Sequence, residues 1–188
     1  MIVLETSLKD VIQGCLLGKR KAQETLYKLF AAKMLGVCMR YATDKMEAED
    51  MLQNGFIKVF SKMQDFKGEG SFEGWMRRIM VHSAIEYYRK YNKMMQLVDM
   101  ETPGVESTVN SVAACSLEAK DLLAIIQTLP PGYRMVFNMY AIEGYSHKEI
   151  GEIMNISEGA SKSQLSRART ILKEKVNKTE GVKYENFG

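Results

Sequence analysis

The sequence predicts an all-α protein of two helical domains, an N-terminal helical bundle and a C-terminal helix-turn-helix domain, joined by a flexible linker. Apolar residues recur at three- and four-residue spacing through most of the chain, as in amphipathic helices. The stretch 92–115 lacks this period and contains Pro103 and Gly104, which is typical of an extended linker. The stretch 129–172 has the pattern of a short helix, a turn and a longer helix. We therefore expect domains at 1–91 and 116–188.

The first three helices are expected at the N-terminus. Ser7 and Asp10 form a capping-box pair that starts a helix, and Gly18 ends it. A second helix is predicted from about Arg20 to Tyr41, and a third begins near Asp44. In the third helix the inner stripe is Ala48, Met51, Leu52, Gly55, Phe56, Val59 and Phe60, and the outer face carries Glu49, Asp50, Gln53, Asn54 and Lys58.

A glycine-containing loop and a long basic helix complete the bundle. Gly68 and Gly70 break helicity, and Ser71 caps the helix that follows. One side of this helix is Phe72, Met76, Ile79, Ser83 and Tyr87, and the other is Arg78, His82, Glu86 and Arg89, with Arg77 and Lys90 at the margins. Aromatic residues beside basic ones favour a platform for unstacked bases, at Phe66, Phe72 and Trp75. The alternative is that these aromatic residues are core.

The second domain is expected to begin with two short helices. Ser116 caps a helix with Leu122, Ile125, Ile126 and Leu129 on its packed face. Pro130 and Pro131 suit the first turn of the next helix, in which Val136, Phe137, Tyr140 and Ala141 recur at helical spacing. Gly144 ends that helix.

The helix-turn-helix pattern follows. Ser146 and Glu149 form a capping box before Ile150, Ile153 and Met154, the turn is at Asn155 and Ile156, and Ser157 caps the last helix. Its buried seam is predicted at Ser161, Leu165, Ala168 and Leu172, and its exposed stripe at Ala160, Ser163, Gln164 and Arg167, flanked by Lys162, Arg169 and Lys173. Gln and Arg suit base edges, whereas Ser and Lys suit phosphates. The alternative is a solvated face of an ordinary helix, but two caps at this spacing favour DNA reading.

Composition limits the classes of binding site and the cellular locations that the chain can have. The chain has 188 residues and a net charge of +3, so a nucleic-acid surface requires local clustering of charge. Such a cluster exists, because Lys162 to Lys178 contains six basic residues and one acidic residue. Cys15, Cys38 and Cys115 are odd in number and widely separated, which predicts reduced cysteines. No CxxC occurs and both histidines lie far from every cysteine, so we expect no metal site and no cofactor. The N-terminus lacks a signal-peptide pattern and no run has membrane-spanning length, so we expect a cytoplasmic protein without membrane insertion.

Three segments together resemble the extracytoplasmic-function (ECF) sigma factors, the compact bacterial class that keeps conserved regions two and four. AEDMLQNGFIKVF (48–60) resembles the region-two helix that docks on RNA polymerase, and FKGEGSFEGWMRRIMVHSAIEYYRK (66–90) resembles the part that opens and reads the minus-10 element. GYSHKEIGEIMNISEGASKSQLSRAR (144–169) resembles the region-four helix-turn-helix that reads the minus-35 element. The resemblance covers nearly the whole chain apart from the linker.

The resemblance implies partners and site residues. It implies core RNA polymerase as a partner at Asp50, Gln53 and Asn54, and promoter DNA at two sites. The minus-10 residues would be Phe66, Phe72, Trp75, Arg77, Arg78, His82, Glu86 and Arg89, and the minus-35 residues Ala160, Lys162, Ser163, Gln164, Arg167, Arg169 and Lys173. An anti-sigma partner is implied by the family alone. The chain departs from common family residues at His82 and Glu86, so the minus-10 preference does not carry over. It also departs at Asn54, beside the family-like Asp50 and Gln53, at Ser161, which weakens a buried contact, and at Gln164, which changes the preferred base.

The function expected from these features is that of a promoter-specificity subunit, which is not an enzyme. The sequence shows no paired carboxylates and no nucleophile–histidine pattern, and KGEGS lacks the Gly-Lys-Ser/Thr of a phosphate-binding loop. One alternative is a stand-alone helix-turn-helix regulator whose N-terminal bundle senses a ligand or dimerises. Another is an enzyme with an all-helical fold, which would need a metal or cofactor site.

Overall fold

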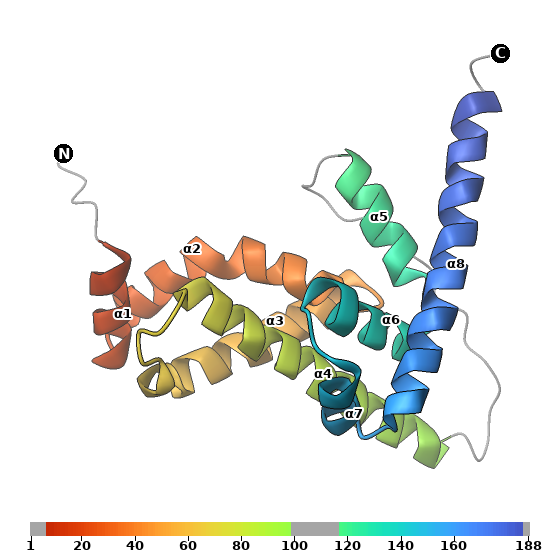
Figure 1. Ribbon diagram of the computed structural model, residues 1–188. Coiled ribbons are helices and arrows are strands. Elements are labelled where there is room, and N and C mark those ends of the chain that lie inside the picture. The colour runs from red at the N-terminus through yellow and green to blue at the C-terminus, as the bar shows by residue number, and fades with distance from the viewer. Residues whose placement is uncertain (1–6, 99–116, 186–188) are drawn as a thin grey trace. The chain divides into compact units, whose positions relative to one another are not determined.

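The computed structural model describes residues 7–98 and 117–185, and every regular element within these ranges is a helix (Figure 1). The helices of the N-terminal range are α1 (Leu8–Leu16), α2 (Arg20–Met39), α3 (Lys45–Ser61), the short 3₁₀ turn η1 (Met63–Asp65) and α4 (Phe72–Val98). Those of the C-terminal range are α5 (Leu117–Gln127), α6 (Pro131–Phe137), the π-helical turn η2 (Asn138–Ile142), α7 (His147–Met154) and α8 (Glu158–Glu185). The predicted all-α class is confirmed.

The described chain forms two compact units. The first contains residues 7–38 and 46–84, and the second contains residues 39–45, 85–98 and 117–185. Helix α4 therefore begins in the first unit and ends in the second.

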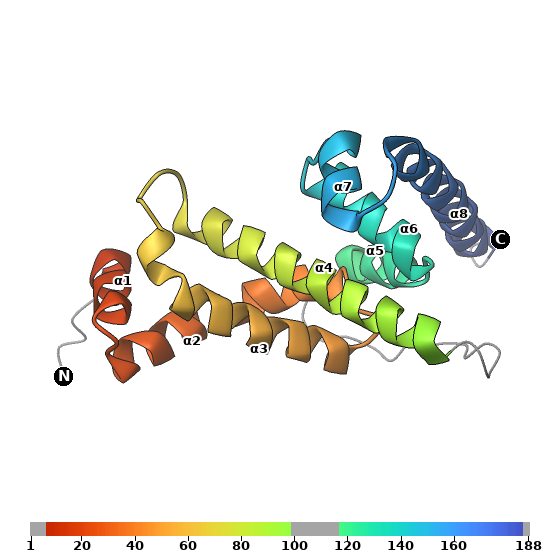
Figure 2. The ribbon, with the colours of Figure 1, turned by 90° about the horizontal axis from the view of Figure 1, so that it is seen from below.

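The first unit is built around aromatic and methionine contacts between α2, α3 and α4. The rings of Tyr27 and Phe56 lie 4.7 Å apart between α2 and α3, and those of Phe30 and Phe72 lie 6.0 Å apart between α2 and α4. Figures 1 and 2 both show α3 running alongside α4. At their contact Gly55 gives room to the thioether of Met80, since a β-carbon there would overlap the Met80 side chain. Close packing of α3 on α4 thus depends on this glycine.

Local signals at the helix ends match the sequence predictions. Ser7 and Asp10 form the predicted reciprocal capping box of α1, and Gly18 follows the helix with φ of +69°. The Ser71 hydroxyl accepts a 3.2 Å hydrogen bond from the amide of Gly74 in the first turn of α4. The predicted inner stripe of α3 is buried except for Phe60, which is half-buried. Caps are read correctly from sequence because their hydrogen bonds are local.

Helix α4 continues to Val98, so the predicted start of the linker at Asn92 is wrong for residues 92–98. Asn92–Val98 lacks the apolar spacing of a packed face but contains no Gly or Pro, and Lys, Met, Gln and Leu are good helix formers. The loss of apolar period therefore did not mark the end of the helix. Residues 99–116, with the predicted linker residues Pro103 and Gly104, Cys115 and the predicted cap Ser116, lie outside the described residues.

The second unit is organised on α8, which packs against α5, α6 and α7. Within residues 117–185 the buried apolar residues are Leu129, Met135, Val136, Met139, Ile150, Met154, Leu165 and Ala168, and the unit also buries Met39, Tyr41, Ala42 and Ile85. The buried guanidinium of Arg134 donates a 2.9 Å hydrogen bond to the carbonyl of Gln127, which ties α6 to the end of α5.

The π-helical turn η2 changes which residues face this core. The sequence prediction that Tyr140 and Ala141 share the packed face with Val136 is wrong, because both are exposed and Met135 and Met139 are buried instead. A π-helical turn holds more residues than an α-helical turn, so side chains after Asn138 are rotated relative to the α-helical pattern. Tyr140, 37% exposed, is thereby directed toward the α7–α8 side of the unit.

Candidate nucleic-acid interface

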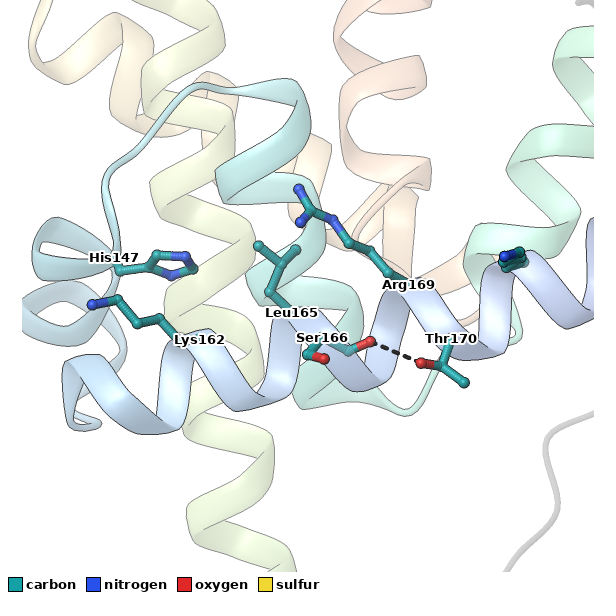
Figure 3. Close-up of a pocket in the computed structure, with 7 residues that line it drawn as sticks. His147, Lys162, Leu165, Ser166, Arg169 and Thr170 are labelled. Carbon is teal, nitrogen blue, oxygen red and sulfur yellow. Dashed lines mark hydrogen bonds between the residues drawn. The ribbon is translucent and has the colours of Figure 1, made fainter.

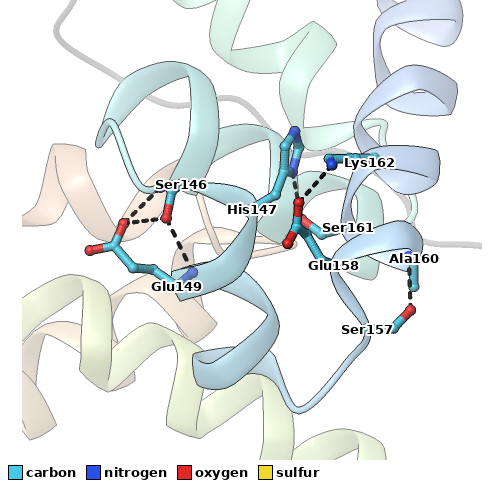
Figure 4. Close-up of polar contacts among 8 residues, drawn as sticks. All are labelled: Ser146, His147, Glu149, Ser157, Glu158, Ala160, Ser161 and Lys162. Carbon is cyan, nitrogen blue, oxygen red and sulfur yellow. Dashed lines mark hydrogen bonds and ion pairs between the residues drawn. The ribbon is translucent and has the colours of Figure 1, made fainter.

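Helices α7 and α8 form the predicted helix-turn-helix. Ser146 accepts a 3.2 Å hydrogen bond from the amide of Glu149, and the Glu149 carboxylate accepts a 2.8 Å hydrogen bond from the amide of Ser146, as the capping box predicted (Figure 4). Asn155 ends α7 in the left-handed conformation, with φ of 56°. The chain then turns directly into α8, where the Ser157 hydroxyl accepts a 3.0 Å hydrogen bond from the amide of Ala160.

The inner face of α8 matches the predicted seam. Ser161 and Ala168 are fully buried, Leu165 is buried and Leu172 is half-buried. Ser161 is polar, and its hydroxyl lies 2.9 Å from Nδ1 of His147, the first residue of α7. The two helices are therefore joined by a side-chain hydrogen bond.

The outer face of α8 is basic. Lys162, Ser163, Arg167, Arg169 and Lys173 are exposed, and Ala160 is half-buried. Lys162 forms a 2.6 Å ion pair with Glu158, one turn earlier, and this lysine holds the pKa of Glu158 below its ordinary value. Arg167 donates a 3.2 Å hydrogen bond to the hydroxyl of Tyr133, which raises the pKa of the guanidinium.

Gln164 does not lie on the fully exposed stripe expected from the sequence. Its side chain is half-buried, its Oε1 atom is buried, and that atom accepts no hydrogen bond from the described residues. The atom lies 3.4 Å from the place that a β-carbon on Gly132 would take, so Gln164 packs against the start of α6. Helical spacing alone does not reveal this contact, because it depends on the missing side chain of a glycine on another helix.

A hollow of about 340 Å³ lies along α8 (Figure 3). It is lined by His147, Lys162, Leu165, Ser166, Arg169, Thr170 and Lys173. Sequence reasoning missed His147, Ser166 and Thr170 as site residues. A usable signal existed, because Lys162, Ser166, Arg169 and Lys173 recur at the same four- and three-residue spacing as a buried seam, yet all of them are polar.

An aromatic cluster forms in the first unit where the sequence placed a base platform. The ring of Phe66 lies 5.0 Å from that of Phe72 and 5.5 Å from that of Trp75. Phe72 is buried, whereas Phe66 and Trp75 are half-buried, so the cluster is partly core and partly surface. The loop before it contains Gly68 and Gly70, with φ of +77° and +76°.

The polar side of α4 carries the other residues proposed for the minus-10 element. Arg78, Glu86 and Arg89 are exposed, and Arg77 and His82 are half-buried. All five are positioned by one helix, but Glu86 and Arg89 lie in the part of α4 that belongs to the second unit.

The outer face of α3 is polar in its middle and apolar toward its ends. Asp50, Gln53 and Asn54 are exposed, and the Asn54 amide donates a 2.9 Å hydrogen bond to the Asp50 carbonyl. Met46 is 72% exposed and Ile57 is 66% exposed. These two apolar residues were not identified from the sequence.

Other kinds of site have little support in the described residues. No group of three His, Cys, Asp or Glu side chains in the described ranges is arranged to hold a metal ion. Cys15 and Cys38 are buried and are not joined in a disulfide, and burial raises the pKa of Cys15. Among the residues searched, no helix combines the length and apolar character that a membrane span requires.

The described residues are helical, and they contain a basic helix-turn-helix in which Ser146 caps α7 and Ser157 caps α8. These features are those of a helical DNA-binding protein. Family models assign it further: "Sigma-70 region 2" matches residues 26–94 and "Sigma-70, region 4" matches residues 119–172. The chain belongs to the sigma-70 family, in the ECF class, and it acts as a promoter-directing transcription initiation factor.

Similar proteins carry ECF sigma-factor names. The chain is 28% identical to the ECF RNA polymerase sigma factor SigW of Bacillus subtilis, over 92% of this chain and 98% of the relative. It is 27% identical to the ECF RNA polymerase sigma-E factor of Haemophilus influenzae, over 85% of this chain and 89% of the relative. The solved sigma factor RpoE of Bartonella quintana, in complex with the anti-sigma factor NepR, has the same fold, with a TM-score of 0.53 at 20% identity over 82% of this chain and 96% of that one.

Proposed function

We propose that the chain binds core RNA polymerase through α3 and reads two promoter elements with separate parts of the molecule. Region two is proposed to lie within residues 1–98, because α4 continues to Val98, and region four within residues 116–188, with the proposed linker reduced to residues 99–115. The protein is proposed to be cytoplasmic and to have no enzymatic activity of its own. The observation that carries the proposal is the capped helix-turn-helix with its basic α8, in a chain that also has an exposed polar face on α3.

The minus-35 element is proposed to lie against α8. Ser163 and Arg167 are exposed on one edge of the helix, and Lys162 lies beside them. Arg offers bidentate donors to base edges, and Ser and Lys offer donors to bases or phosphates. We give the reading role to Ser163 and Arg167, with Ala160 near the N-terminus of α8, and we place Lys162, Arg169 and Lys173 along the backbone. Gln164 can contact a base only if its side chain moves away from Gly132, against which it packs.

The minus-10 element is proposed to bind the aromatic cluster and the polar side of α4. Phe66 and Trp75 are half-buried, so each has a ring surface partly open to solvent, while Phe72 supports them from the core. Stacking of an unpaired base on an aromatic ring typically contributes about 1–3 kcal/mol. The cationic and polar residues of α4 proposed to follow the strand are Arg77, Arg78, His82, Glu86 and Arg89.

A regulatory partner is also proposed. One similar structure is that of a sigma factor bound to an anti-sigma factor, and the family resemblance implies such a partner here.

Polymerase docking is tested by the double substitution Asp50→Ala with Gln53→Ala. Truncating polar groups at the centre of an interface often costs about 2 kcal/mol or more, so we expect affinity for core polymerase to fall about tenfold or more. Both residues are exposed, so the thermal midpoint should change little. Affinity is measured by fluorescence anisotropy of the labelled full chain titrated with core polymerase.

The matched control removes the exposed Lys28–Glu24 pair of α2 by Glu24→Ala with Lys28→Ala, which should retain polymerase binding. If the Asp50/Gln53 variant and the wild type had equal affinity for core polymerase, α3 would not be the docking surface. A wild-type chain that bound duplex DNA but not core polymerase would favour the stand-alone regulator instead.

A further inference from the structure

The hollow along α8 is lined by donors that suit phosphate. Its cationic residues are Lys162, Arg169 and Lys173, and its hydroxyl residues are Ser166 and Thr170. The Thr170 hydroxyl donates a 3.2 Å hydrogen bond to the carbonyl of Ser166, so the donors that face an anion are the three cations and Ser166 (Figure 3). None of the seven lining residues carries a carboxylate. The nearby carboxylate of Glu158 is engaged by Lys162 at 2.6 Å. The hollow therefore has the donor chemistry of an anion site.

Tyr140 supports two of the groups at this hollow. Its ring stacks on that of His147, with centroids 4.4 Å apart and an interplanar angle of 20°. The guanidinium carbon of Arg169 lies 5.7 Å from the centroid of the same ring, within the range of a cation–π contact. One exposed aromatic side chain thus contacts a lining residue of α7 and a lining residue of α8.

His147 is fixed from its other side by Ser161. The buried Ser161 hydroxyl lies 2.9 Å from Nδ1 of His147, as Figure 4 shows. A hydroxyl that donates to Nδ1 leaves the ring proton on Nε2, and that nitrogen is then a donor for an anion. The stack and the hydrogen bond together restrict the ring more than either would alone.

The length of the hollow indicates what kind of anion fits. Lys162 and Lys173 both line it, and a helix rises about 1.5 Å per residue, so the lining extends for about 16 Å along α8. A single free phosphate ion could contact only one part of such a length. A polymer with regularly repeated phosphates could contact both ends, as a DNA strand does.

We propose that this hollow binds the phosphate backbone of one strand of duplex DNA, and that Tyr140 is the positioning residue that holds His147 and Arg169 toward it. The inference rests on the proposed function, because it assumes that α8 lies against DNA. It divides α8 into a reading edge with Ser163 and Arg167 and a backbone edge with Lys162, Ser166, Arg169 and Lys173. Arg169 then contributes affinity without sequence preference.

The test compares Tyr140→Leu with Tyr140→Phe in the full chain. Binding to a labelled duplex of arbitrary sequence is measured by anisotropy over a series of salt concentrations. We expect Tyr140→Leu to bind about fivefold more weakly at about 0.1 M salt, and the slope of log K against log salt to become less negative by about 0.9 for each phosphate that the variant no longer neutralises. Tyr140→Phe keeps the ring and should behave like the wild type.

A double-mutant cycle separates positioning from a merely structural role. Arg169→Ala should weaken duplex binding in the wild type, but should add little to Tyr140→Leu, because the leucine variant already lacks the support for Arg169. Lys9→Ala, an exposed lysine of α1, is the charge-matched control and should leave the slope unchanged. Thermal midpoints of all variants identify any that fail to fold, and His147→Gln, which keeps a donor but loses the stacked ring, then replaces Tyr140→Leu.

Several results would overturn the inference. One is a folded Tyr140→Leu variant with the wild-type affinity and slope, and another is full additivity with Arg169→Ala. If inorganic phosphate at constant ionic strength displaced the duplex from the wild type but not from Tyr140→Leu, the hollow would be a site for a free anion instead. Failure of the wild type to bind any duplex, both alone and in the holoenzyme, would contradict the proposed function as well, whereas a normal salt slope in Tyr140→Leu contradicts this inference alone.

Discussion

The turn of the helix-turn-helix brings the backbones of Gly151 and Ile156 into direct contact. The amide of Ile156 donates a 3.0 Å hydrogen bond to the carbonyl of Gly151, and a β-carbon on Gly151 would lie 2.8 Å from the carbonyl oxygen of Ile156. The opposing atom is backbone, so it cannot move away by a side-chain rotation. The close approach of α7 to the start of α8 therefore depends on the absence of a side chain at Gly151.

Gly151→Ala is expected to destabilise the second unit by about 1–3 kcal/mol, because overpacking at a rigid contact forces backbone shifts. The measurement is denaturant unfolding, with hydrogen exchange of α7 and α8 amides to locate the effect. Gly159→Ala in the first turn of α8 is the control, since its nearest neighbour is the Ser157 hydroxyl at 3.9 Å and Ala is the better helix former. Equal stability of the two variants would show that the turn tolerates a β-carbon at Gly151.

Gln164→Leu distinguishes a packed residue from a base reader. Because the buried Oε1 accepts no hydrogen bond from the described residues, an apolar side chain of similar size should hold or raise stability by up to about 1 kcal/mol. Affinity for a DNA site selected by the wild-type protein from a random duplex library should change less than about twofold in the holoenzyme. A loss of about 1–3 kcal/mol at one base position would instead restore the sequence-based hypothesis that Gln164 reads a base.

The helix caps and the buried seam of α8 could be predicted from the sequence. The caps at Ser7, Ser146 and Ser157 and the turn at Asn155 were predictable, because each depends on residues within a few positions of one another. The buried seam of α8 was predictable from its spacing alone.

The positions of Tyr140, Gln164 and His147 could not be predicted, because they depend on features that the spacing of apolar residues does not encode. The π-helical turn η2 rotated Tyr140 out of the packed face, and a glycine on another helix allowed Gln164 to be half-buried. The hollow along α8 also depended on tertiary contacts, since His147 is held beside it by Tyr140 and Ser161. Helix α4 continues to Val98, beyond the point where the apolar spacing in the sequence ends, because Asn92–Val98 contains no residue that breaks a helix.

Glu158→Gln tests whether the acid next to Lys162 limits DNA affinity. Lys162 holds the pKa of Glu158 below its ordinary value, so the carboxylate is charged near neutral pH and engages the lysine. Because the folded-state pKa of Glu158 is lowered, the ion pair adds to the free energy of unfolding at pH values above the unfolded-state pKa of Glu158. This stabilisation is lost as pH falls through the lower folded-state pKa. Both side chains are exposed, so that contribution is expected to be small.

Removing the charge should raise affinity for any duplex about two- to fivefold at about 0.1 M salt, because Lys162 is released and a repulsive carboxylate is lost. Anisotropy titrations at neutral pH provide the measurement. Weaker binding of Glu158→Gln to all duplexes would show that the ion pair positions Lys162 instead of competing with DNA.

The loop before the aromatic cluster is expected to matter for strand opening. Gly68 and Gly70 both have positive φ, and a β-carbon at either position would meet no atom within 4 Å, so substitution strains the local backbone without disturbing the packing. Gly68→Val with Gly70→Val should leave polymerase binding intact and abolish promoter melting, as followed by permanganate reactivity. A premelted template should restore transcription, and continued inactivity on that template would indicate a folding defect.

The measurement that tests the central claim most directly is transcription by purified core RNA polymerase on fragmented genomic DNA of the source bacterium, with and without the full chain. RNA 5′ ends are mapped by sequencing. The account predicts that the chain produces a set of discrete start sites that share two elements upstream, and that these starts disappear with Asp50→Ala/Gln53→Ala. Start sites that do not change when the chain is added, in a mixture where a known sigma factor works, would contradict it.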